Sequence, residues 1–151
     1  MPQRSAGLLV FRETSGFLEL FLVHPGGPIY AKRDLGVWSI PKGLFDSDED
    51  PLTAARREFE EETGQKIAGD FIELSPITQK GGKLVYCWAV EGEPDADNIE
   101  SNTFSIEWPP KSGRIREFPE VDRAAWFDVK TARQKILPAQ ADLIDDLVAK
   151  L

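Results

Sequence analysis

The sequence has few of the residues that form disulfides or thiol and imidazole metal sites. It contains one cysteine, Cys87, one histidine, His24, and one methionine. A single cysteine excludes an intrachain disulfide. Because Cys87 lies in a strand-like apolar run, we expect a buried and unreactive thiol. His24 has no second histidine or cysteine near it in the sequence, which argues against a zinc site.

Basic residues are fewer than acidic ones. The 18 lysines and arginines face 26 aspartates and glutamates, which gives a net charge of -8. An anionic protein repels nucleic acids and anionic membranes, so neither is the expected partner. A polyanionic ligand would therefore need a bound cation to bridge it to the protein.

Long hydrophobic runs are missing as well. No stretch approaches the roughly 20 apolar residues that cross a bilayer. Residues 1–5 carry no apolar signal segment. With the single cysteine, this predicts a protein of a reduced compartment, the cytoplasm.

The remaining composition is that of an ordinary globular protein. The chain has 151 residues, of which 41% are hydrophobic and 29% charged. This length can bury a sizeable core without disulfides. We expect a single domain over residues 1–151, present as a monomer or a homodimer.

Apolar patterning and turn residues predict an α/β protein in which strands dominate. The expected strands cover residues 6–12, 17–24, 37–40, 71–78, 83–90, 103–108 and 124–129. A central helix begins after Asp50 as its N-cap, with Pro51 at its first position, and ends at Gly64. A second helix is expected over residues 139–151. Residues 25–36 read as a loop rich in glycine and proline, and residues 109–119 read as a loop with basic residues.

The central helix carries the chemically informative pattern. Glu58, Glu61 and Glu62 are spaced i, i+3 and i+4, which places them within about 100° of arc on one face. Like charges so placed repel each other and destabilise a helix. A plain acidic run is usually a solvated surface, but this spacing is explained by a divalent cation held among the carboxylates. Such oxygen ligands suit Mg²⁺, or Mn²⁺, better than zinc.

These residues belong to a longer motif. The pattern Gly43-x5-Glu49-x7-Arg57-Glu58-Phe59-x-Glu61-Glu62-x-Gly64 resembles the Nudix box, the signature of hydrolases that act on nucleoside diphosphates linked to another group. At a frequency of about 7% for each of the seven fixed polar and glycine positions, a chance match at a given start is about 10⁻⁸. One position departs: Gln65 stands where the motif closes with an aliphatic residue, and we expect Ile67 to take over its packing role.

The likeness extends beyond the box. Residues 4–12, 38–43 and 49–52 look like the corresponding segments of the diadenosine tetraphosphate hydrolase branch of that family. Residues 81–83 are Gly-Gly-Lys, where that branch carries a base-stacking tyrosine, so the resemblance does not single out diadenosine polyphosphates. It implies the Nudix fold, an α/β/α sandwich with a central mixed β-sheet.

The resemblance also implies a set of metal ligands. Glu58 and Glu62 are the first candidates, together with the backbone carbonyl of Lys42. Glu61 would bind a second metal or take the proton of the attacking water. Glu120 would supply an additional carboxylate from a later loop, or be an ordinary loop residue.

Supporting and substrate-binding roles follow in the same way. Arg57 and Glu49 are expected to pair and hold the geometry between the loop and the helix, and Gly43 to permit a backbone turn that exposes the Lys42 carbonyl. The candidates for binding phosphates, otherwise surface charges, are Arg4, Lys42, Lys80, Lys83, Arg114 and Arg116. The candidates for stacking on a base, otherwise core residues, are Tyr30, Tyr86, Trp108 and Phe118.

The expected function is Mg²⁺-dependent hydrolysis of a phosphoanhydride bond in a nucleoside polyphosphate or a related linked diphosphate. Three alternatives stay open. A Nudix-fold module could bind a nucleotide without cleaving it. An RNA 5′-end pyrophosphohydrolase is weakened by the net charge of -8 and kept open by the basic segment 111–116. An isomerase of isoprenoid diphosphates needs a cysteine acid, for which Cys87 in mid-strand is a poor candidate.

Overall fold

The computed structural model describes residues 3–151, beginning with a long β-hairpin. Strands β1 (Arg4–Thr14) and β2 (Phe17–Pro25) are antiparallel, with Phe11 opposite Leu20. Ser15 and Gly16 connect them, and both have positive φ, 54° and 82°. Two such residues form the tight turn whose twist matches that of the paired strands. The two predicted strands are therefore confirmed and extend up to the turn.

The central sheet has seven strands and is mixed. Its order is β4-β6-β1-β2-β9, with β3 paired to β1 and β5 paired to β6. These strands are β3 (Lys42–Leu44), β4 (Ile72–Glu73), β5 (Ile77–Gln79), β6 (Lys83–Glu91) and β9 (Val121–Asp128). The β1–β6 pair is parallel, with Gly7 opposite Cys87, and the other pairs are antiparallel.

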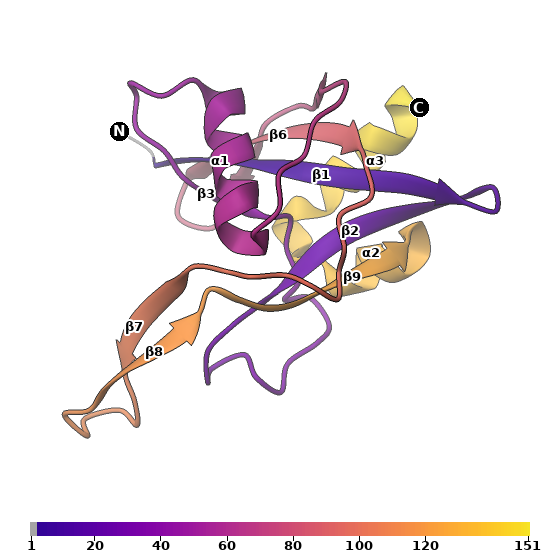
Figure 1. Cartoon of the computed structure of the whole chain (residues 1–151). Coiled ribbons are helices and arrows are strands. Elements are labelled where there is room, and N and C mark those ends of the chain that lie inside the picture. Colours follow the sequence, from indigo (N-terminus) through magenta and orange to yellow (C-terminus); the bar gives the residue numbers. More distant parts are fainter. Residues whose placement is uncertain (1–2) are drawn as a thin grey trace.

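Helices cover both faces of this sheet, as Figure 1 shows. Helix α1 (Pro51–Thr63) packs on one face, while α2 (Val129–Lys135) and α3 (Ala141–Lys150) pack on the other. Side chains of β1 alternate between the two layers: Leu8 belongs to the α1 side and Leu9 to the α3 side. The α/β/α sandwich with a central mixed sheet is thus confirmed. None of the helices in residues 3–151 combines the length and apolar character that a membrane crossing requires.

Helix α1 has the predicted ends. The Asp50 carboxylate accepts a hydrogen bond from the Thr53 backbone N–H at 3.0 Å, and Pro51 occupies the first turn. Gly64 ends the helix with φ 75°, a left-handed conformation that glycine adopts without steric cost. Ile67 packs on the α1-side core as expected, while the Gln65 amide bonds to backbone atoms of Asp95.

Two predicted strands are corrected. Residues 37–40 form only isolated bridges, because Ser39 pairs with Val23 whereas Trp38 pairs with Ile136, so no ladder can develop. The third strand lies further on, as β3. The predicted strand 71–78 is interrupted between β4 and β5 at a segment containing Pro76, which has no backbone N–H to continue a ladder.

The segment 103–135 needs the largest correction. The predicted loop 109–119 contains strand β8 (Ile115–Pro119), which pairs with β7 (Thr103–Glu107) in a separate two-stranded hairpin. The predicted strand 124–129 runs over Val121–Asp128, and Asp128 then caps α2, a helix that the apolar pattern did not indicate. The C-terminal helix begins at Ala141, after a short 3₁₀ turn, η1 (Pro138–Gln140).

The buried ring of Phe59 ties α1 to the sheet and gives the first prediction. Its ring centroid lies 5.9 Å from that of Phe21 on β2, and the side chain is fully buried. We expect Phe59→Ala to lower the free energy of unfolding by about 3–5 kcal/mol, through lost burial and an unfilled cavity. Urea denaturation measures this loss. Val148→Ala, at an exposed position on α3, is the control, and a loss below about 1 kcal/mol for Phe59→Ala would contradict the packing described.

Candidate active site

The candidate site lies where β3 meets α1. Gly43 of β3 pairs with Ala6 of β1 and faces the Glu58 carboxylate of the helix. A Cβ added at Gly43 would lie 2.1 Å from Glu58 Oε2. The φ of Gly43 is not positive, so glycine is needed for the missing side chain and not for the predicted backbone turn. The glycine creates a cradle that holds a carboxylate against the strand.

Arg57 organises the carboxylates around this cradle. Its guanidinium donates two hydrogen bonds of 2.9 Å to Glu49, which is the predicted pair. The remaining terminal nitrogen, Nη1, donates to Glu58 at 2.8 Å and to Glu61 at 3.1 Å. Such charge-assisted and bidentate bonds are among the stronger hydrogen bonds in proteins. The Arg57 guanidinium therefore connects the loop before α1 to two glutamates of the helix.

Burial and mutual repulsion disfavour the ionised forms of two glutamates. Glu58 is 8% exposed, and burial raises its pKa although its bond to Arg57 acts in the opposite direction. Burial also raises the pKa of Glu62 to about 8, and the charges of Glu58 and Glu120 add to this shift. The Lys42 backbone N–H donates to Glu62 Oε1 at 3.3 Å, which compensates only in part. Closely spaced, desolvated carboxylates of this kind are suited to a cation.

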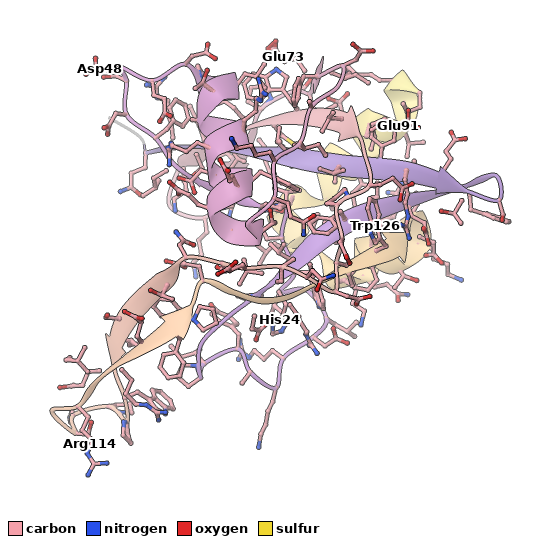
Figure 2. The ribbon with its side chains drawn as sticks, in the orientation of Figure 1. His24, Asp48, Glu73, Glu91, Arg114 and Trp126 are labelled. Carbon is pink, nitrogen blue, oxygen red and sulfur yellow. The ribbon has the colours of Figure 1, made fainter. Side chains whose placement is uncertain are left out.

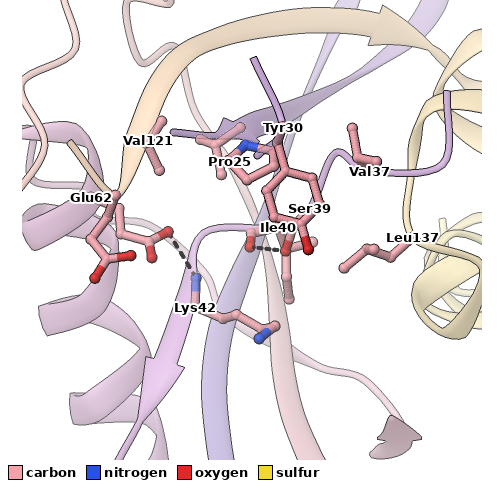
Figure 3. A pocket seen from close by; sticks show the side chains of 11 residues that line it. Pro25, Tyr30, Val37, Ser39, Ile40, Lys42, Glu62, Val121 and Leu137 are labelled. Carbon is pink, nitrogen blue, oxygen red and sulfur yellow. Dashed lines mark hydrogen bonds between the residues drawn. The ribbon is translucent and has the colours of Figure 1, made fainter. Parts of the chain in front are cut away.

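A cavity of about 240 Å³ opens beside Glu62. Figure 3 shows Glu62 at one end, Leu137 at the other and the ring of Tyr30 between them. Lys42 and Glu120 contribute charged groups to its lining, and burial together with the charge of Lys83 lowers the pKa of Lys42. The cavity thus joins an acidic end, a lysine and an aromatic ring.

Residues 25–36 form one wall of this cavity, and hydrogen bonds connect this segment to neighbouring parts of the chain. The fully buried ring of His24 lies 2.7 Å from Asp122 Oδ1 through Nδ1 and 2.7 Å from the Arg33 carbonyl through Nε2. The Gly26 N–H donates to the Glu120 carbonyl at 2.9 Å. His24 therefore links this loop to β9 near the cavity.

Sequence reasoning missed another wall of the cavity. The buried amide of Gln140 accepts from the Ile40 backbone N–H and donates to Ser39 Oγ, both at 3.0 Å. Ser39, Val37 and Leu137 line the cavity together. Residues about 100 positions apart meet here, and no local pattern signals such a contact.

The structure separates the predicted substrate-binding residues. Lys42 lines the cavity, whereas the Arg4 guanidinium stacks over the Phe45 ring, 4.9 Å from its centroid. The Tyr86 ring lies 6.0 Å from the same Phe45 ring and packs against the α1-side core. The other two predicted substrate-binding residues lie on different strands: Lys83 begins β6, and Arg116 lies on β8. Of the stacking candidates, Tyr30 lines the cavity.

The donor set fits a hard divalent cation, although its side chains do not converge. Within residues 3–151, no three histidine, cysteine, aspartate or glutamate side chains form a group that could hold an ion as they stand. Glu58 and Glu61 accept hydrogen bonds from Arg57, while Glu62 accepts one from the Lys42 backbone N–H. The cradle at Gly43 nevertheless brings Glu58 onto β3, and all the available donors are carboxylate or carbonyl oxygens, as Mg²⁺ and Mn²⁺ prefer.

Comparisons with known proteins find relatives over nearly the whole chain. A family model described as NUDIX domain matches residues 1–147. An RNA pyrophosphohydrolase of Rhodospirillum rubrum is 29% identical over 161 residues, covering 99% of this chain and 92% of the relative. One from Brucella anthropi is 32% identical, covering 85% and 76%. A crystal structure of a C. elegans Ap4A hydrolase binary complex has a TM-score of 0.68 and 23% identity, covering 98% of this chain and 96% of that one.

The raised pKa of Glu62 gives a prediction about stability. The unfolded carboxyl ionises near its usual pKa of 4.5, whereas the folded one keeps its proton up to about 8. The stability that the protonated Glu62 side chain contributes to the folded state is therefore fully present below pH 4.5. It is lost as pH rises through about 8. We expect Glu62→Gln to be more stable than the wild type in metal-free buffer, by at least about 2–4 °C at pH 8.

Melting temperatures measured with a chelator from pH 5 to pH 9 test this, and the advantage of the variant should grow with pH. The control is Glu60→Gln, an exposed position on the same helix. A lower melting temperature for Glu62→Gln at pH 8 would show that the buried carboxylate is stabilising after all.

Proposed function

The chain belongs to the Nudix family, and we propose that it is a pyrophosphohydrolase that cleaves a phosphoanhydride bond in nucleoside polyphosphates or in nucleoside diphosphates linked to another group. The observation that carries this proposal is the network around Arg57 and Gly43. It holds Glu58 against β3, one helical turn from Glu62, which lines a cavity that also contains Lys42 and Tyr30. We further propose that residues 1–151 act as one Nudix domain.

Nudix hydrolases generally use divalent metal ions, and we propose Mg²⁺, with Mn²⁺ as a substitute. Glu58, Glu61 and Glu62 would hold the ions, joined by the Lys42 carbonyl and by Glu120. A bound cation of this kind lowers the pKa of water and offsets charge on the phosphoryl oxygens. When bound, the same cation would relieve the repulsion between the buried carboxylates and a polyanionic substrate.

The side chains around the cavity divide the remaining tasks. The Lys42 ammonium, which lines the cavity near the acidic end, binds a phosphoryl oxygen as a charge partner. The half-exposed ring of Tyr30 stacks on a base. Glu61 either holds a second ion or takes the proton from the attacking water, and its 3.1 Å bond to Arg57 keeps it beside Glu58.

Arg57 and Glu49 act through these groups and not on the substrate. The two hydrogen bonds between them leave Arg57 Nη1 directed at Glu58 and Glu61. This holds Glu61 beside Glu58, whose carboxylate lies against Gly43 of β3. Correct placement of reacting groups contributes much of the rate in phosphoryl transfer.

A second candidate function is removal of pyrophosphate from RNA 5′ ends. The RNA pyrophosphohydrolases of R. rubrum and B. anthropi match most of this chain. Between Trp108 and Arg116 the sequence carries three basic residues and no acidic one, in a protein of net charge -8. That local reversal of charge supports a phosphate-rich substrate longer than a mononucleotide.

The proposal predicts the behaviour of two conservative variants. We expect Glu61→Gln and Glu62→Gln each to lower kcat by about 10²–10⁴-fold with Mg²⁺, through loss of a proton acceptor or of a cation ligand. Turnover is measured on a panel of nucleoside triphosphates, dinucleoside polyphosphates and nucleotide sugars. Product identification in ¹⁸O-labelled water shows which phosphorus is attacked.

Glu60→Gln is the matched control, because Glu60 lies on the same helix and is exposed. It should keep wild-type turnover, and removal of divalent cations with EDTA should abolish turnover in all proteins. Wild-type rates in both Glu61→Gln and Glu62→Gln would end the assignment. Tight nucleotide binding by the wild type without any turnover would instead favour a nucleotide-binding module.

A further inference from the structure

The hairpin of β7 and β8 extends away from the sandwich and pairs with no strand of the central sheet among the described residues (Figure 1). Its tip is well defined by internal hydrogen bonds. The Trp108 N–H donates to the Arg114 carbonyl at 2.9 Å, and the Lys111 N–H donates to Glu107 Oε1 at 3.0 Å. The Arg114 N–H donates to Ser112 Oγ at 3.1 Å. The hairpin is therefore an ordered arm.

The two faces of this arm differ sharply in chemistry. Residues directly opposite each other in an antiparallel pair share a face, as do residues two apart. The pairs Phe104–Phe118 and Ile106–Arg116, followed by Trp108 with Arg114, thus share one face. The hairpin's two glutamates, Glu107 and Glu117, lie on the opposite face.

Exposure also differs between the faces. The aromatic side chains of the first face, Phe104, Trp108 and Phe118, are half-buried, while Arg114 and Arg116 beside them are exposed. The Arg116 guanidinium lies over the Phe118 ring, 5.4 Å from its centroid. In Figure 2 Arg114 is at the far end of the arm. The face combines half-buried aromatic rings with exposed guanidinium groups.

The base of this face lies close to the cavity that Glu62 and Glu120 line. The Phe104 ring packs so closely on Gly27 of the cavity-wall loop that a Cβ there would lie 2.7 Å from it. Strand β8 leads directly into Glu120, which lines the cavity. At about 3.3 Å per residue, Arg116 lies about 13 Å along the chain from Glu120, and Arg114, which is bonded to Trp108, lies about 20 Å from it. A ligand that reaches this face can therefore also occupy the cavity.

We propose that this face of the hairpin binds the second nucleotide of a two-nucleotide substrate, its base stacked on an aromatic ring and its phosphate bound by Arg114 and Arg116. The inference rests on the proposed hydrolase function and names the substrate class of the same site. Aromatic platforms beside arginines suit stacked bases and phosphates, because every base has a π-face and guanidinium matches phosphate geometry. A dinucleoside polyphosphate and the 5′ end of an RNA present the same chemistry.

The test compares kcat/KM for ATP, diadenosine tetraphosphate and a 5′-triphosphorylated RNA dinucleotide. We expect Trp108→Ala and Arg116→Gln each to lower the ratio of the two-nucleotide substrates to ATP by about tenfold. Trp108→Phe should restore most of the ratio. Arg116→Gln should also reduce the slope of log(kcat/KM) against log salt by about 1 for the two-nucleotide substrates.

Matched controls separate binding from folding. Ile115→Ala removes an apolar side chain that is 69% exposed on the opposite face of the same hairpin, and Lys130→Gln removes an exposed charge on α2. Neither should change the ratio. A fall for diadenosine tetraphosphate alone, or for the RNA dinucleotide alone, supports the proposal and identifies the source of the second nucleotide. Ratios within twofold of wild type for both substrates overturn it.

Failure of the proposed hydrolase function is distinguishable from failure of this inference. If the wild type cleaves none of the three substrates, equilibrium binding of the same two-nucleotide compounds, followed by calorimetry in Mg²⁺, decides the matter. A Kd weakened about tenfold by Trp108→Ala upholds the second-nucleotide site without catalysis. An unchanged Kd, or no binding by the wild type, overturns it.

Discussion

The fit of the Glu58 carboxylate against the backbone of Gly43 is the constraint on which the site depends. It needs a strand without a side chain at that position and a helix laid close enough to reach it. The resulting crowding of carboxylates is unfavourable in itself, since burial raises the pKa of both Glu58 and Glu62. Arg57 compensates for part of this cost and a cation would compensate for the rest, so stability has been exchanged for a functional arrangement.

The central sheet and helix α1 together position this contact between Glu58 and Gly43. The parallel β1–β6 pair forms the middle of the sheet, and β3 pairs with the N-terminal part of β1. Phe59, one residue after Glu58, is buried against the same sheet. Adjacent residues of α1 thus serve core packing and chemistry. Any shift of the helix relative to the sheet would move the carboxylates away from β3.

Local features of the molecule could be predicted from the sequence, and tertiary ones could not. The ends of α1 follow from Asp50, Pro51 and Gly64, and the Arg57–Glu49 pair follows from the motif. The mixed sandwich followed from resemblance to a family. By contrast, the contact of Gln140 with Ser39 depends on chain reversal across about 100 residues, which leaves no periodic signal.

The hairpin of β7 and β8 was missed in part because glycine and proline in its tip resemble an ordinary loop. Its lack of pairing with the central sheet, within residues 3–151, has an evolutionary consequence. An appendage that pairs with no strand of the main sheet within residues 3–151 can be lengthened, recharged or replaced while the hydrolytic helix stays intact. Proteins with this fold could then diverge in ligand preference by changing this peripheral hairpin. The chemistry of the helix would be inherited unchanged.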